Sequence, residues 1–276
     1  MNNFKQFISG TFIRNVILVA TGTASAQLIS MLLSPVITRV YGPEAYGLMG
    51  TFTSILHIIT PIAALTYPIA IVLPKRDHDA NGLAKLSLII TFGISFFLCL
   101  ILFFFNGYIV NMFNIEAVEP FLLLLPIAIF LSGVMQIVEQ WLIRTKQFRA
   151  TARSTFLQAI IIQGGKAGIG LIHPTAGVLI FLSAIAEGVK AALMFFFSRK
   201  TVRKLNLRLN RQNSLKDLAV KYRDFPVFRA PETFLNAIST NLPTLMLTTF
   251  FGPAAAGFYN IGKTVLNIPS QLIGKS

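Results

Sequence analysis

Charged residues are scarce in this chain. Asp, Glu, Lys and Arg make up only 12% of its 276 residues, about half the share in a soluble globular domain. Hydrophobic residues make up 54%, and the mean hydropathy is +0.68. A single packed core cannot hold that much apolar surface, because the excess would face water. The composition therefore excludes a soluble enzyme and a disordered regulator.

Cysteine and the usual catalytic motifs are also nearly absent. Cys99 is the only cysteine, which excludes an intrachain disulfide and a cysteine-based metal cluster. The three histidines are scattered, and the Gly-rich loop that cradles phosphates in ATP-driven proteins does not occur. We therefore expect no enzymatic activity, no metal and no cofactor.

Long apolar runs are what the chain has instead. A helix needs about 20 apolar residues to cross the ~30 Å hydrocarbon layer, whereas a barrel strand needs only about 10. The sequence predicts an all-α polytopic membrane protein. Its eight expected spans are residues 16–38, 48–73, 86–105, 120–142, 155–172, 175–197, 231–251, and 258 onward.

Acidic residues are few, and their distribution predicts the orientation. The chain has 24 Lys and Arg against 10 Asp and Glu, a formal charge of +14. The basic residues gather in alternate loops, around Lys75, around Lys146 and within 199–229. The positive-inside rule places these loops and the N-terminus in the cytoplasm. This distribution accounts for the charge without a nucleic-acid partner.

One stretch of the chain is too polar to span. In 201–229, Leu215, Leu218, Ala219 and Tyr222 share one face of a predicted helix. We expect this amphipathic helix to lie on the inner leaflet, where its basic residues meet anionic lipid. The expected organisation is thus a first transmembrane lobe at 1–200, a basic linker at 201–229, and the start of a second lobe at 230–276.

An internal repeat supports two lobes. The motif G-P-x-A-x-G occurs at 42–47 and again at 252–257, an offset of 210 that also matches Thr38 with Thr248. Six spans separate the copies, so the two halves have the same orientation and an axis along the membrane normal relates them. The repeat predicts six plus six helices. Since this chain ends within the eighth span, we expect it to be a fragment of a protein with about twelve spans.

Three stretches carry a family resemblance. They begin LSPVITRVYGPEAYG at 33, YPIAIVLPKRD at 67 and FPVFRAPETFLN at 225. They resemble the polysaccharide biosynthesis protein family, the Wzx-type O-antigen and capsule flippases of the multidrug/oligosaccharidyl-lipid/polysaccharide exporter superfamily. The resemblance implies that the protein lies in the bacterial inner membrane and moves undecaprenyl-diphosphate-linked oligosaccharide units to the outer leaflet by alternating access. It also implies membrane lipids, a polysaccharide polymerase and a chain-length regulator as partners.

Charges within spans are costly and are candidates for function. The sequence offers nine cavity candidates with ionisable or amide side chains: Arg14, Arg39, Glu139, Lys166, Glu187, Lys190, Arg229, Glu232 and Asn236. Arg14 either anchors the first span or contacts diphosphate, and Arg39 is basic on the outer side. Glu139 either pairs with Arg144 or faces sugar. Arg229 and Glu232 open the seventh span, where a helix N-terminus favours an anion.

The fifth and sixth spans carry a separate cluster of charges. They are joined by a short turn and should pack side by side, so Lys166 and Glu187 come within reach of each other, and Lys190 lies three residues from Glu187. The three residues form either a site for an anionic substrate or a neutral structural pair with Lys190 reaching the interface. Asn236 either lines the cavity or bonds between helices.

Two other functions compete with flipping. A cation-coupled drug exporter of the same superfamily would use acidic residues in the spans. A membrane polysaccharide polymerase would need a large outer loop, and the longest one here, 106–119, has only two acids, Glu116 and Glu119.

Overall fold

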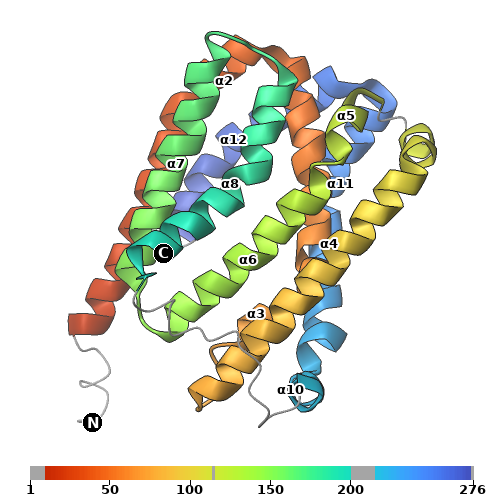
Figure 1. Cartoon of the computed structure of the whole chain (residues 1–276). Helices are drawn as coiled ribbons and strands as arrows, with labels where there is room; N and C mark the ends of the chain where they lie inside the picture. Colours follow the sequence, from red (N-terminus) through yellow and green to blue (C-terminus); the bar gives the residue numbers. More distant parts are fainter. Residues whose placement is uncertain (1–9, 114–115, 200–214, 275–276) are drawn as a thin grey trace.

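The computed structural model describes residues 10–113, 116–199 and 215–274. All regular elements in these ranges are helical. The long helices run roughly along one direction (Figure 1), with the turn before α4 and the short helix α10 at one end and helix α5 at the other. Four helices are long and apolar enough to cross a membrane: α2, α4, α6 and α8. The chain is an all-α polytopic membrane protein.

Helix α2 (Gly10–Ala63) contains the first two expected spans and bends sharply between them. The bend lies at Gly42, whose φ of 73° and ψ of 172° are left-handed and essentially restricted to glycine. Pro43 then starts the second half with no backbone N–H to pair. The structure thus confirms the turn that the first G-P-x-A-x-G motif predicts.

The second span is shorter than its apolar run. It ends at Ala63, where the expected span continued to residue 73. Leu65 and Thr66 have left-handed φ values of 49° and 55°, which breaks the helix before the one-turn helix α3 (Tyr67–Ala70). Hydropathy does not detect this break, because the residues on both sides of it are apolar.

The remaining helices of the first bundle differ from the expected spans mainly at their ends. Helix α4 runs from Asp77 to Phe113 and is longer than expected. The fourth span is divided into a 3-10 turn η1 (Glu116–Val118), α5 (Glu119–Leu122) and α6 (Leu125–Arg144). Helices α7 (Phe148–Gly170) and α8 (Ala176–Phe197) complete what we call the first bundle, α2 to α8.

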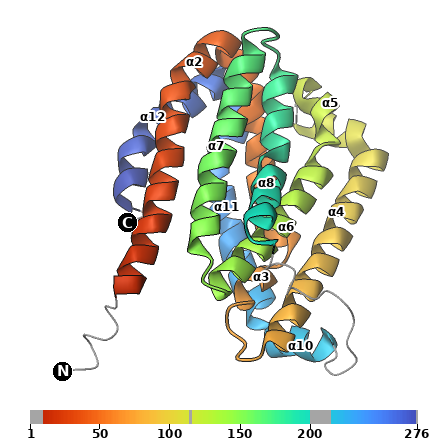
Figure 2. The same cartoon turned by 60° about the vertical axis from the view of Figure 1, so that its left-hand side comes forward.

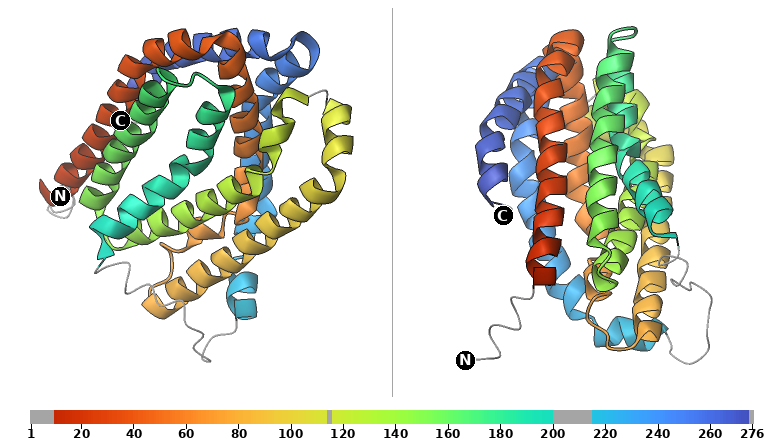
Figure 3. Two further views of the ribbon diagram at one scale, coloured as in Figure 1. Left: turned by 45° about the horizontal axis from the view of Figure 1, so that its top comes forward. Right: turned by 90° about the vertical axis from the view of Figure 1, so that its left-hand side faces the viewer.

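The last part of the structure is a helical hairpin. Helix α10 (Leu215–Lys221) and a π-helical turn η2 (Phe225–Arg229) lead into α11 (Ala230–Phe251) and α12 (Pro253–Gly274). Helices α11 and α12 pack on α2, and α12 lies beside the first half of α2 on the side away from α7 (Figures 2 and 3). The expected spans at 155–172, 231–251 and 258 onward therefore exist as helices. They are more polar than the other four, and α7 alone carries Arg149, Arg153 and Lys166.

Small residues set the spacing of the first bundle. A side chain at Gly22 on α2 would collide with Ala152 on α7, and one at Gly188 on α8 would collide with Leu131 on α6. Close backbone approach is how helices associate in lipid, where apolar burial gives no driving force. The larger buried side chains, such as Phe52, fill the centre among α2, α6 and α8.

Helix α10 packs against the first bundle, a contact that the sequence did not predict. Leu218 is buried against α4, in the space that a side chain at Gly82 would occupy. The Tyr67 hydroxyl donates a hydrogen bond to the Ala219 carbonyl at 3.1 Å. The apolar face of α10 is thus docked on the first bundle. Ser214, which with Asp217 resembles a capping box for this helix, lies outside the described residues.

Candidate functional site

Lys166 is a charged side chain buried within the first bundle, 9% exposed. Its Nζ donates a hydrogen bond to Ser183 Oγ on α8 at 2.8 Å and lies 3.5 Å from Met49 Sδ on α2. The Tyr41 hydroxyl donates to the Lys166 carbonyl at 2.8 Å, which holds this turn of α7 against α2. Among the described residues no carboxylate lies within ion-pair distance of the amine. Such a cation is costly in a membrane and points to function.

A polar cavity of about 220 Å³ borders Lys166. Its walls come from both halves of α2, from α7 and from α12, and they are rich in hydroxyl groups. Gln163 Nε2 donates to Ser30 Oγ at 3.1 Å across the α2–α7 contact. The lining residues are Ser30, Ser34, Ile37, Tyr46, Met49, Gln163, Lys166 and Thr264. One cation among hydroxyl and amide groups can bind an anionic or hydroxyl-rich ligand.

A second charged cluster lies between α6 and α8. Lys190 Nζ forms an ion pair with Glu139 Oε1 at 3.1 Å. Glu187 lies one turn from Lys190 on α8, and its Oε2 atom is buried without a hydrogen-bond partner in the described part of the chain. The sequence predicted that Lys166 and Lys190 both lie close to Glu187. In the structure Lys190 instead forms its ion pair with Glu139, and Lys166 donates its hydrogen bond to Ser183. The reason is that α6, and not α7, faces this part of α8.

The predicted alternative for Glu139, an ion pair with Arg144, is wrong. Arg144 Nη2 pairs with Asp77 Oδ1 at 2.9 Å. Its Nη1 also donates to the Pro74 carbonyl at 2.6 Å and to the Ile71 carbonyl at 3.2 Å. Arg144 therefore fastens the end of α6 to the turn between α3 and α4.

The other candidates do not join these clusters. Arg39, Arg229, Glu232 and Asn236 are exposed. The side chain of Arg14 lies outside the part of the structure that is described, although its backbone is in α2. The structure thus brings Glu139, Glu187 and Lys190 to one region and Lys166 to another, and it leaves four exposed candidates apart from both: Arg39, Arg229, Glu232 and Asn236.

Several polar residues near the cavity were not predicted. Ser183 lies four residues before Glu187 and seven before Lys190, so its helical spacing places it on the polar face of α8. Lys263 on α12 donates to the Thr240 carbonyl at 3.0 Å and lies 6.0 Å from the Tyr259 ring centroid. Its position as a cation within the eighth span was the available signal. Ser30, Ser34 and Thr264 give no such signal, because serine and threonine are ordinary in membrane helices.

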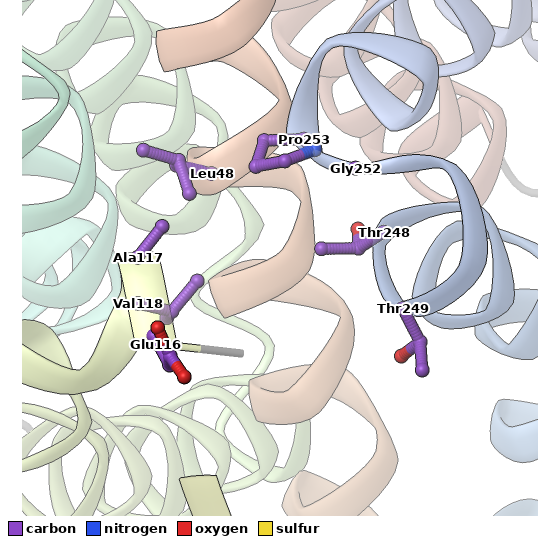
Figure 4. Close-up of a pocket in the computed structure, with 8 residues that line it drawn as sticks. All are labelled: Leu48, Glu116, Ala117, Val118, Thr248, Thr249, Gly252 and Pro253. Carbon is purple, nitrogen blue, oxygen red and sulfur yellow. The ribbon is translucent and has the colours of Figure 1, made fainter. Parts of the chain in front are cut away.

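A larger pocket of about 380 Å³ lies at the α5 end of the bundle (Figure 4). Leu48 of α2, the residues of η1 and the junction of α11 with α12 surround it. Figure 4 shows Thr248, Gly252 and Pro253 on one side of α2 and Glu116, Ala117 and Val118 on the other. The pocket therefore borders the contact between the first bundle and the α11–α12 hairpin.

The fold and the site define the class: a polytopic helical membrane protein with a buried cation beside a polar cavity. A family model described as polysaccharide biosynthesis protein matches residues 36–276. The chain belongs to this family. Neither the curated proteins nor the solved structures include a match.

Proposed function

We propose that the protein is a flippase for lipid-linked oligosaccharide, carried on undecaprenyl diphosphate, in surface polysaccharide biosynthesis. Membership of the polysaccharide biosynthesis family supports the pathway. The observation that carries the proposal is Lys166, a buried cation with only neutral partners at a polar cavity. Its role is to attract the diphosphate, while the hydroxyl and amide groups around it accept and donate hydrogen bonds to sugar.

The physical demands of flipping fit this arrangement. The lipid tail stays in the bilayer, so only the polar head needs a path through the protein. A polar head costs several kcal/mol or more for each unsatisfied group in hydrocarbon. A cavity walled by α2, α7 and α12 supplies partners from the first bundle and from the hairpin together. Alternating access between two lobes would then expose the head first inside and later outside.

A strain that lacks its own flippase tests the proposal. The gene that encodes this protein should restore surface polysaccharide in such a strain, and Lys166→Ala should abolish the restoration at a normal level of membrane protein. Arg149→Ala on the same helix is the matched control, because Arg149 is exposed, and it should restore normally. Equal export by both variants would contradict the proposal.

The orientation is proposed on the positive-inside rule. The turns that carry Lys75, Arg76 and Lys146 lie at one end of the bundle, the end of α10 (Figure 1). Cysteine at Lys146, and at Lys204 in the undescribed linker, should be shielded from an impermeant thiol reagent in intact cells. Cysteine at Glu116 should react. Labelling of position 146 from outside would reverse the orientation.

One observation favours a cation-coupled drug exporter as the second candidate. Glu187 has a buried carboxylate oxygen without a partner among the described residues, as a site for a coupling cation would need. In that case the gene should protect a drug-sensitive strain and Glu187→Gln should remove the protection. A flippase should instead leave drug sensitivity unchanged.

A further inference from the structure

Tyr41 is a buried tyrosine in the contact between α2 and α7, which lie side by side (Figure 1). The residue is 7% exposed, and its hydroxyl donates to the backbone carbonyl of Lys166 at 2.8 Å. A buried tyrosine needs a partner for its hydroxyl group. The partner here belongs to the residue whose side chain carries the buried charge, so Tyr41 ties the backbone of Lys166 to α2.

Gly170 makes room for this hydrogen bond. It is the last residue of α7 and lies one turn beyond Lys166. A Cβ atom at Gly170 would collide with the ring of Tyr41 and would stand 2.8 Å from its hydroxyl oxygen. Any side chain at this position would therefore push the phenol away from the Lys166 carbonyl.

The bend in α2 surrounds the same turn of α7. Tyr41 lies immediately before the bend, and Tyr46 and Met49 follow it. Tyr41 and Tyr46 belong to one buried cluster with Ala167, and Met49 Sδ lies 3.5 Å from the Lys166 amine. The part of α2 before the bend thus holds the backbone of Lys166, and the part after the bend contacts its side chain.

The amine of Lys166 keeps one hydrogen-bond donor for a ligand. A lysine ammonium has three N–H groups. One bonds to Ser183 Oγ, which accepts because its own hydroxyl donates to the Leu179 carbonyl at 2.8 Å. A second faces Met49 Sδ, which is a weak acceptor. The third has no acceptor among the described residues, and Lys166 lines the 220 Å³ cavity.

We propose that Tyr41 is a positioning residue for Lys166, whose hydrogen bond fixes this turn of α7 so that the third N–H of the amine points into the cavity. The proposal deepens the proposed function and rests on it, because the ligand of that N–H is the diphosphate. Ser183 and Met49 lie on other helices, so a shift of the α7 turn changes the distances to both and redirects the remaining donor. Tyr41 does not line the cavity, so it acts on the ligand only through Lys166.

Tyr41→Phe removes the hydroxyl and keeps the ring. Binding of undecaprenyl diphosphate and of undecaprenol to the purified protein in detergent should be compared, because the two lipids share a tail and only the first has a diphosphate. The variant should bind undecaprenyl diphosphate about 3- to 10-fold more weakly, which is the size of one hydrogen bond, and bind undecaprenol as the unmodified protein does. A purely structural role would weaken the binding of both lipids equally.

Two glycines of α7 give a matched pair of variants. Gly170→Ala leaves Tyr41 and Lys166 unchanged but displaces the phenol, so it should weaken the binding of undecaprenyl diphosphate as Tyr41→Phe does. Gly168→Ala is the control, because nothing lies within 4 Å of an added Cβ there. Both variants exchange glycine for alanine near the end of the same helix, so the difference between them isolates the contact with Tyr41.

A double variant shows whether Tyr41 acts through the amine. In the Lys166→Met protein the lipid tail still binds, and adding Tyr41→Phe should cause no further loss of affinity for undecaprenyl diphosphate. Two residues that act through one interaction are non-additive in this way, whereas the effects of independent residues add. An equal loss with and without the Lys166 amine would overturn the proposal.

A chemical measurement needs no lipid. Mass spectrometry can follow the rate at which acetic anhydride acetylates Lys166 in the purified protein, with the exposed Lys75 as the reference in the same sample. Tyr41→Phe and Gly170→Ala should raise the rate at Lys166 several-fold, because they release the turn, and leave the rate at Lys75 unchanged. Gly168→Ala should change neither rate.

The outcomes separate this proposal from the flippase proposal. An unchanged acetylation rate at Lys166 in the Tyr41→Phe protein overturns the positioning role and leaves the flippase proposal standing. A loss of affinity that is equal for the two lipids also overturns it. If the unmodified protein binds both lipids equally, the flippase proposal fails at this site, and the acetylation rates still support or refute the role of Tyr41.

Discussion

Replacing Lys166 by methionine separates a functional role from a structural one. Met keeps the long unbranched stem of Lys and removes the charge. The change removes one hydrogen bond from an ammonium group, to Ser183 Oγ, which is a contribution of about 1.5–3 kcal/mol. It also removes the desolvation cost of a buried ion, which is several kcal/mol.

The balance should favour the variant. Ser183 keeps a partner, because its hydroxyl donates to the Leu179 carbonyl at 2.8 Å, so no buried donor is orphaned. Apolar replacement of buried charge is often stabilising by about 1–4 kcal/mol. We expect Lys166→Met to unfold at a temperature a few degrees higher, at about 2–4 °C per kcal/mol for a chain of this size.

Export should fall while stability rises. Recovery of surface polysaccharide in the flippase-null strain measures export, and thermal unfolding of purified protein in detergent measures stability. Lys166→Arg keeps the charge and is the matched variant that should retain part of the export. A methionine variant that unfolds at a lower temperature and still exports would refute the reasoning, because Lys166 would then be a structural residue only.

Two further predictions follow from the backbone and from the second cluster. Gly42→Ala and Gly252→Ala should each destabilise the protein by about 1–3 kcal/mol, because both positions have a conformation restricted to glycine. No atom lies within 4 Å of an added Cβ at either position, so the loss comes from the backbone conformation and not from a clash. Thermal unfolding measures the loss, and an unchanged midpoint would contradict the prediction. Glu139→Leu alone should destabilise by about 1–3 kcal/mol, since it leaves Lys190 without its carboxylate. Adding Lys190→Met should recover most of that loss, and additive losses in the double variant would show that the pair contributes nothing as a pair.

The spans and the repeat could be predicted because they depend on local patterns. Apolar length defines a span, and the glycine and proline of each motif define a turn, wherever the rest of the chain lies. The bend at Gly42 follows directly from its motif. The break at Leu65 and Thr66 has no Gly-Pro pair, and the helix continues past Pro61 before it ends, so the break was missed.

The partners of charged residues depend on which helix face meets which. Lys190 is three residues from Glu187, and this spacing allows an ion pair on one helix. The neighbouring helix α6 brings Glu139 to 3.1 Å, and that pair forms instead. Lys166 likewise meets Ser183, whose helical spacing places it on the polar face of α8 but does not say which residue of α7 it contacts. Distances between helices are set by packing at small residues, so a single sequence cannot rank these partners.

Helix α11 is tied to the first bundle near both of its ends. The Thr66 hydroxyl donates to the Phe225 carbonyl at 3.0 Å, so the turn that enters α11 is held against the first bundle. Near its other end, Thr248 of α11 is hydrogen-bonded to Thr51. A helix held at both ends cannot move against the first bundle as a rigid rod. If one tie opens while the other holds, α11 must bend between them, and Pro243 is the proline inside it. A hinge would then lie within α11 itself, and the turns at its two ends would stay in place.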